Sequence, residues 1–146
     1  MDLKSQHHGG ELFGKKVVLL PVKDLHVTVV QCNEHFNKPF FKNLTEDIQR
    51  DGLQFPLMVV ETTKDQLVAQ KQIYKERMVP IEPIMSNYLD EEKFYVCWGG
   101  SQRQRVAQNL GYENVDCIIF ENGDYRGAMG RQQDMRSPYM KRYYTN

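Results

Sequence analysis

A short segment rich in glycine and arginine is the part of this sequence best suited to chemistry. Its candidate binding residues are Gly99, Gly100, Ser101, Gln102, Arg103 and Arg105. The run Lys93–Trp98 has strand character and Ser101–Leu110 has helical character, so the pattern predicts a strand, a glycine turn and the first turn of a helix. Glycine allows positive φ at such a turn and has no side chain to obstruct a ligand.

The start of a helix favours an anion, because its first amide groups lack partners within the helix and the helix dipole is positive there. We expect Ser101 to cap this helix or to donate its hydroxyl group to a phosphate. Arg103 lies where the dipole disfavours a cation, and a bound phosphate would remove that conflict. The same residues also fit a tight turn with a serine cap and two solvated arginines. The segment is not a Walker loop, since no Gly-Lys-Ser/Thr follows the glycines.

Strand and helix patterns around this turn predict an α/β (α+β) domain. The expected strands are Lys16–Leu20, Leu25–Gln31, Leu57–Glu61, Lys93–Trp98 and Val115–Phe120, and the expected helices are Pro39–Asp51, Thr62–Met78 and Ser101–Leu110. The helix at Pro39–Asp51 is the clearest, because its apolar residues recur at helical spacing and Gly52 follows as a C-terminal cap. Two prolines predict that Val79–Asn87 is a connector rather than a helix.

Length and composition predict one folded domain in the cytoplasm. The chain has 146 residues, 40% of them apolar, and a formal net charge of zero, which argues against a protein that is basic all over. Cys32, Cys97 and Cys117 lack the spacing of a metal site or a paired motif, and we interpret them as reduced, buried thiols. The polar start of the chain does not resemble a signal peptide, and no apolar run is long enough to cross a membrane.

The chain divides into three segments by composition. We expect a flexible arm at residues 1–14, the folded domain at 15–121 with an insert at 61–93, and a basic tail at 122–146. The insert either recognises a partner or covers an edge of the sheet. The tail interleaves tyrosines with arginines, which suits single-stranded nucleic acid, although packing on its own domain explains it too. The acidic run Asp90–Glu92 could supply a metal ligand or a base, or be a solvated loop.

Several short motifs resemble those of the ParB/sulfiredoxin superfamily. The run from Gly100 to Ala107 resembles the ParB box Gly-Glu-Arg-Arg-x-Arg-x-Ala, and Trp98–Arg103 resembles the sulfiredoxin stretch Phe-Gly-Gly-Cys-His-Arg. Gly52-Leu53 and Pro56-Leu57 before the box, and Leu110-Gly111 after it, are similar to the motifs that surround it in the family. The resemblance extends from Val17 to Phe120.

The resemblance implies a small mixed sheet flanked by helices, with an inserted helix between two strands. It also implies a nucleotide, such as a nucleoside triphosphate with Mg²⁺, whose phosphates lie over Gly100, Ser101, Gln102 and Arg103 with Arg105 nearby. Ser101 stands where sulfiredoxins have a nucleophilic cysteine, so we expect no sulfinic acid reductase activity. ParB domains have a glutamate linked to hydrolysis at that position, so its absence favours binding over turnover.

Three functional hypotheses follow. The first is a ParB/sulfiredoxin-like protein that binds a nucleotide or nucleic-acid phosphate at this turn, in the DNA-associated biology of a bacterium, plasmid or phage. The second is a ParB-like nuclease, nucleotide hydrolase or kinase. The third is an interaction protein that keeps the fold without the ligand and binds a second copy or another protein through the insert and the tail.

Overall fold

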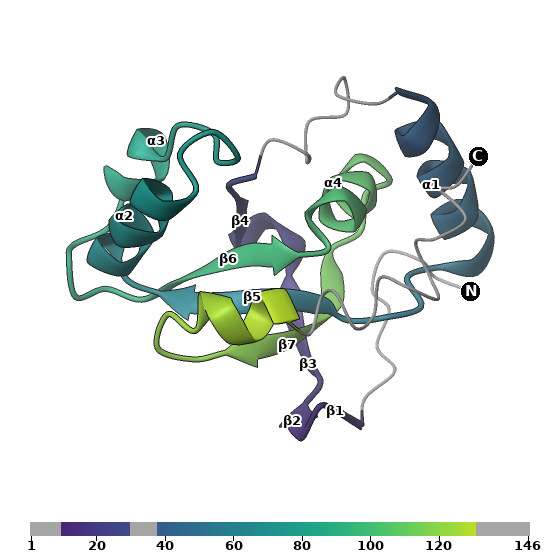
Figure 1. Ribbon diagram of the computed structural model, residues 1–146. Helices are drawn as coiled ribbons and strands as arrows, with labels where there is room; N and C mark the ends of the chain where they lie inside the picture. The colour runs from purple at the N-terminus through teal and green to yellow at the C-terminus, as the bar shows by residue number, and fades with distance from the viewer. Residues whose placement is uncertain (1–9, 30–37, 131–146) are drawn as a thin grey trace.

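A five-stranded mixed sheet forms the centre of the computed structural model, which describes residues 10–29 and 38–130 (Figure 1). In chain order its strands are β3 (Val18–Pro21), β4 (Leu25–Val27), β5 (Leu57–Thr62), β6 (Phe94–Gly99) and β7 (Asn114–Phe120). The spatial order is β3-β7-β5-β6-β4. The outer strand β3 is antiparallel to β7, and β5 is antiparallel to β6, whereas the pairs β4–β6 and β5–β7 are parallel. The predicted α+β class with a mixed sheet is confirmed.

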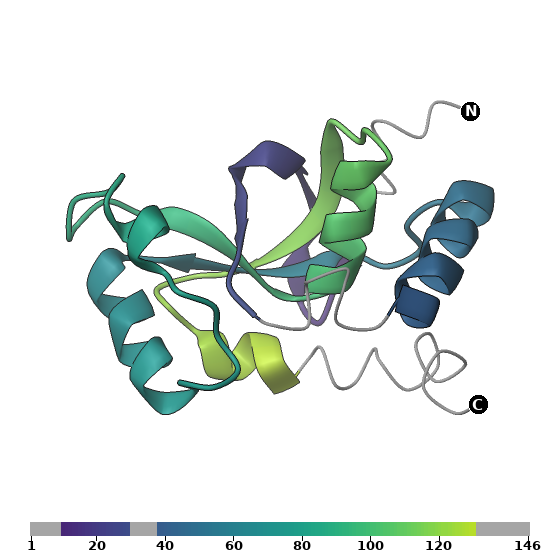
Figure 2. The same cartoon turned by 90° about the horizontal axis from the view of Figure 1, so that it is seen from above.

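Side chains of the central strands alternate between two buried clusters, as the two-residue period of a strand requires. Leu57, Val59 and Cys97 belong to the cluster beneath α1 (Lys38–Asp51) and α4 (Ser101–Asn109). Met58, Val60 and Val96 belong to the cluster that contains Leu67 of α2 (Lys64–Ile73) and Tyr125. In the view from above, α4 and a last helix at residues 125–130 lie on opposite sides of the sheet (Figure 2).

The helices form where their sequences favour them. Phe40, Phe41, Leu44 and Ile48 of α1 are all buried at helical spacing, and Gly52 follows the helix with φ of 75°. Thr63 precedes α2 in a reciprocal capping box, in which its hydroxyl accepts from the Gln66 amide at 3.3 Å and Gln66 Oε1 accepts from the Thr63 amide at 2.9 Å. The inserted helix between two strands is therefore present as α2, between β5 and β6.

Three expectations about local structure are wrong. Residues 10–14 are not part of an arm, because β1 (Glu11–Leu12) pairs with β2 (Lys15–Lys16) in a hairpin whose turn is possible with positive φ at Phe13 and Gly14. The connector Val79–Asn87 contains a short helix, α3 (Glu82–Met85), with proline in its first turn. Proline is tolerated there because the amide at that position has no partner within the helix. The expected strand Leu25–Gln31 ends at Val27 in β4, after the 3-10 helix η1 (Val22–Asp24).

The first part of the predicted tail packs on its own domain. Tyr125 is buried, its hydroxyl donates to Thr62 Oγ1 at 2.8 Å, and its ring meets Trp98 edge to face with centroids 5.0 Å apart. Stacking of this tyrosine on a nucleic acid is therefore excluded by its burial. Cys32, His7 and His8 and the tail residues after Gly130 lie outside the described residues. In the described part, every helix is too short or too polar to cross a lipid bilayer.

An aromatic cluster joins the insert to the edge strand β4. Tyr88 stacks on Phe94 with centroids 4.4 Å apart, and the His26 ring meets both rings edge to face. His26 Nε2 and the Tyr88 hydroxyl form a hydrogen bond of 2.8 Å. Burial lowers the pKa of His26 below its ordinary value, against a smaller opposing effect of Asp24.

This lowered pKa predicts that the domain loses stability in mild acid. The folded chain binds the His26 proton less tightly than the unfolded chain does, so unfolding takes up a proton as the pH falls below the unfolded value of about 6.5. Urea unfolding between pH 7.5 and 5 should show a falling free energy of unfolding, with a shallower fall in His26→Gln. Tyr88→Phe should retain most of the fall, because burial rather than the hydrogen bond is the larger cause. An equal slope in wild type and His26→Gln would contradict this assignment.

Candidate functional site

The end of β6 and the start of α4 form the predicted turn. Gly99 is the last residue of β6 and is buried beside Met58 of β5, and Gly100 has left-handed backbone angles of φ 93° and ψ 21° as the N-cap of α4. The first helical hydrogen bond runs from the Gln104 amide to the Gly100 carbonyl at 2.9 Å. Gly100 provides no side-chain cap, and the first turn of α4 has no acidic residue. The local backbone therefore has the strand end, glycine turn and helix start that the sequence predicts.

Ser101 does not cap the helix. Its hydroxyl is buried and donates to the carbonyl of Cys97 in β6, four residues earlier in the chain, at 3.0 Å. The physical reason is the left-handed glycine before it, which makes Gly100 the N-cap and places Ser101 inside the first turn. This hydrogen bond links the start of α4 to the end of β6.

Arg103 turns inward toward the loop between α1 and β5. Its side chain is buried, with 6% of the residue exposed. Nη1 donates to the Phe55 carbonyl at 2.6 Å and Nη2 donates to the Pro56 carbonyl at 3.3 Å. The alternative of a solvated arginine is therefore wrong at this position. The guanidinium connects the start of α4 to a loop almost fifty residues earlier in the chain.

Gly100 leaves room for that guanidinium. A Cβ atom at this position would lie 2.7 Å from Arg103 Nη2 and 2.9 Å from Leu57 Cδ2, both closer than real Cβ contacts allow. The glycine is therefore required twice, once for its positive φ and once for the close approach of Arg103.

Arg105 and Gln104 have buried polar atoms that lack partners in the described part of the chain. These atoms are Arg105 Nε and Gln104 Oε1, whereas Gln104 Nε2 donates weakly to the Leu25 carbonyl at 3.5 Å. Arg105 is half-buried and Gln102 is partly buried. Buried polar groups are normally hydrogen-bonded, so the unpaired Nε–H of Arg105 is an exception among the described residues.

The other candidate chemical groups lie away from this turn or are inert. Cys97 and Cys117 are fully buried, and burial raises the pKa of Cys117 far above its ordinary value, so it is not a nucleophile. Asp90 lies 3.7 Å from Lys64, and Glu92 accepts from the Leu89 amide at 3.2 Å. Within residues 10–29 and 38–130, no three His, Cys, Asp or Glu side chains come together as metal ligands. The acidic run is thus a surface loop.

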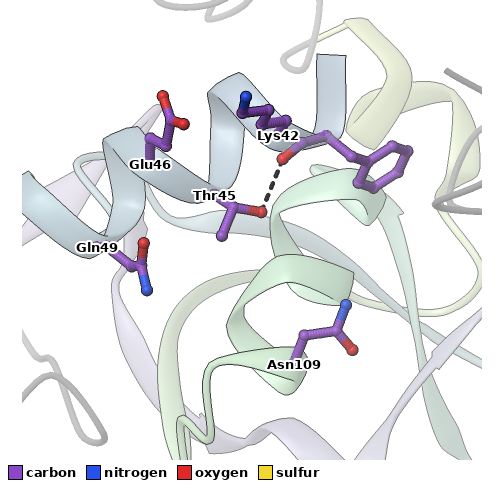
Figure 3. A pocket seen from close by; sticks show the side chains of 6 residues that line it. Lys42, Thr45, Glu46, Gln49 and Asn109 are labelled. Carbon is purple, nitrogen blue, oxygen red and sulfur yellow. Dashed lines mark hydrogen bonds between the residues drawn. The ribbon is translucent and has the colours of Figure 1, made fainter. Parts of the chain in front are cut away.

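A polar hollow of about 360 Å³ lies between α1 and α4. It is lined by Phe41, Lys42, Thr45, Glu46, Gln49 and Asn109, and the Thr45 hydroxyl is bonded to the Phe41 carbonyl at 2.7 Å (Figure 3). Asn109 is at the opposite end of α4 from Gly100. The hollow therefore includes none of the residues predicted to bind an anion. Its lining comes from two helices far apart in the chain, α1 and α4, so no local sequence pattern indicated it.

Of three comparisons with known proteins, the one with solved structures gives matches. The structure is similar to the crystal structure of sulfiredoxin from Arabidopsis thaliana, with a TM-score of 0.46 and 19% sequence identity over 77% of this chain and 96% of that one. No model of a protein family and no curated protein matches the chain. The similarity concerns the fold alone.

The two demands on Gly100 predict an unequal cost of adding a methyl group at two left-handed glycines. Gly111 also has positive φ, at 85°, but has open space around its Cβ position. Gly111→Ala should cost about 1 kcal/mol of unfolding free energy for the backbone alone. Gly100→Ala should cost about 1–3 kcal/mol more, because Arg103 and Leu57 must move. Chemical denaturation measures both variants, and equal costs would show that the close approach of Arg103 is not a constraint.

Proposed function

We propose that this chain binds a phosphate group, of a nucleotide or of a nucleic acid, at the first turn of α4. The observation that carries the proposal is an uncapped helix start with no acidic residue in its first turn, followed by Arg105 with an unpaired buried Nε. Backbone amides and a guanidinium are the donors that phosphate oxygens prefer.

The two arginines have different roles in this proposal. Arg103 braces the turn, because its bonds to the Phe55 and Pro56 carbonyls hold the start of α4 in place before any ligand arrives. Arg105 contacts the phosphate, because its Nε lacks a partner in the described residues. A preorganised set of donors loses less conformational entropy on binding than a mobile one.

A nucleoside triphosphate with Mg²⁺ is one form that the ligand could take. Mg²⁺ usually reaches such sites on the phosphates, with few protein ligands and several waters. The proposal therefore needs no metal cluster in the protein.

Calorimetric titration with pyrophosphate, a panel of nucleoside triphosphates with and without Mg²⁺, and an oligonucleotide tests this function. Arg105→Gln should weaken binding of the anions about 10-fold to 100-fold, the range for a charge-assisted hydrogen bond of about 1.5–3 kcal/mol. Arg50→Gln is the matched control, because Arg50 is an exposed arginine of α1 that bonds Asp47 and Asp51. Its affinity should equal that of the wild type.

Two results would remove the proposal. One is that none of these anions binds the wild type. The other is that Arg105→Gln and Arg50→Gln bind them equally well.

A further inference from the structure

A second hollow lies at the C-terminal end of α2, in the insert. Its volume is about 550 Å³, and it is lined by Gln72, Ile73, Tyr74, Lys75, Glu76 and Arg77. Ile73 is 69% exposed, which is unusual for a large apolar side chain. Lys75 and Arg77 are exposed cations with no ion-pair partner in the described part of the chain. The hollow thus combines apolar, aromatic and charged surface, with two cations, Lys75 and Arg77, and one carboxylate, Glu76.

Tyr74 connects this hollow to the turn before α4. Its ring lies edge to face with that of Trp98, with centroids 6.0 Å apart. Trp98 precedes Gly100 by two residues at the end of β6, a distance of about 7 Å along a strand. Trp98 is partly exposed, and its indole N–H has no hydrogen-bond partner among residues 10–29 and 38–130. The ring contact therefore joins the end of β6, just before the turn, to a residue that lines the hollow.

The last described helix, residues 125–130, ends beside Tyr74. The Tyr74 hydroxyl donates to Met129 Sδ at 3.6 Å, so the helix at residues 125–130 ends beside Tyr74, on the same side of the sheet as α2 (Figure 2). Residues 131–146 then contain four basic residues and one acidic residue, a net charge of +3. Positive charge of this kind attracts a polyanion.

We infer that Tyr74, Trp98 and the hollow at the end of α2 bind the bases of a single-stranded nucleic acid whose phosphate occupies the first turn of α4. This inference rests on the proposed function and names the class of its ligand. Unpaired bases stack on aromatic rings without regard to sequence, and nearby lysine and arginine side chains contact the backbone. Duplex DNA hides its base faces by stacking, and a lone nucleotide has only one base, so a single strand uses this surface most fully.

Trp98 provides a direct readout because it is the single tryptophan of the chain. A 12-nucleotide oligothymidylate should quench its fluorescence as a base stacks nearby, whereas pyrophosphate should leave the emission unchanged. The same quenching by both ligands, or by neither, would overturn the inference.

Two sets of variants of the full chain separate stacking from charge. Tyr74→Leu should weaken oligothymidylate binding about 5-fold to 100-fold, the range for one lost base–aromatic stack of about 1–3 kcal/mol, and leave pyrophosphate affinity unchanged. Tyr88→Leu is the control tyrosine, since Tyr88 packs on Phe94 and His26 away from the hollow. Lys75→Gln with Arg77→Gln should lower the salt dependence of oligothymidylate binding by about 1.4 in the log–log slope, that is about 0.7 per phosphate contact. The control variant, Lys93→Gln with Arg50→Gln, should leave this slope unchanged.

The outcomes distinguish this inference from the proposed function. If pyrophosphate binds and depends on Arg105, but Tyr74→Leu and the Lys75–Arg77 variant bind oligothymidylate like the wild type, the stacking surface is wrong and the phosphate site stands. If oligothymidylate depends on Tyr74 while no anion responds to Arg105→Gln, the surface stands and the phosphate is held elsewhere. If Tyr74→Leu does not fold, the Lys75→Gln and Arg77→Gln variant still tests the inference, because both residues are exposed.

Discussion

The arrangement of this domain depends on the guanidinium group of Arg103. By donating to the Phe55 and Pro56 carbonyls, it attaches the start of α4 to the loop that leads from α1 into β5. A buried cation without acceptors would cost several kcal/mol. The contact requires a glycine at position 100, because any Cβ there meets the guanidinium. One arginine and one glycine thus determine where the first amides of α4 lie.

Much of the fold could be predicted from local patterns. The apolar spacing of α1, the strand residues of β5 and β7 and the glycine before α4 each specify their structure within a few residues, and the observed bounds differ little from those expected. The hairpin at residues 11–16 and helix α3 were missed, because a two-residue strand and a four-residue helix are too short for a periodic signal. Their formation depends on packing of Leu12, Phe13, Ile84 and Met85 against the second buried cluster.

The position of the candidate site could be predicted, and the directions of its side chains could not. A strand, two glycines and a polar helix start are local features. Whether Arg103 faces solvent or Phe55 depends on a contact between residues 48 positions apart, which no local pattern encodes. Ser101 donates to the Cys97 carbonyl because the left-handed Gly100 takes the N-cap position before it. The ring contact between Tyr74 and Trp98 also arises from tertiary packing, since the two residues become neighbours only when the insert folds over β6.

The central claim is that the α4 amides and Arg105 receive the phosphate while Arg103 holds them in place. Nitrogen-15 NMR titration with pyrophosphate tests it most directly, because backbone amides and arginine Nε–H groups give separate signals. The account predicts shifts at the amides of Ser101, Gln102 and Arg103 and at Arg105 Nε, with the Arg103 Nε signal unmoved. Shifts at Arg103 Nε in place of Arg105 Nε, or shifts confined to residues outside this turn, would contradict it.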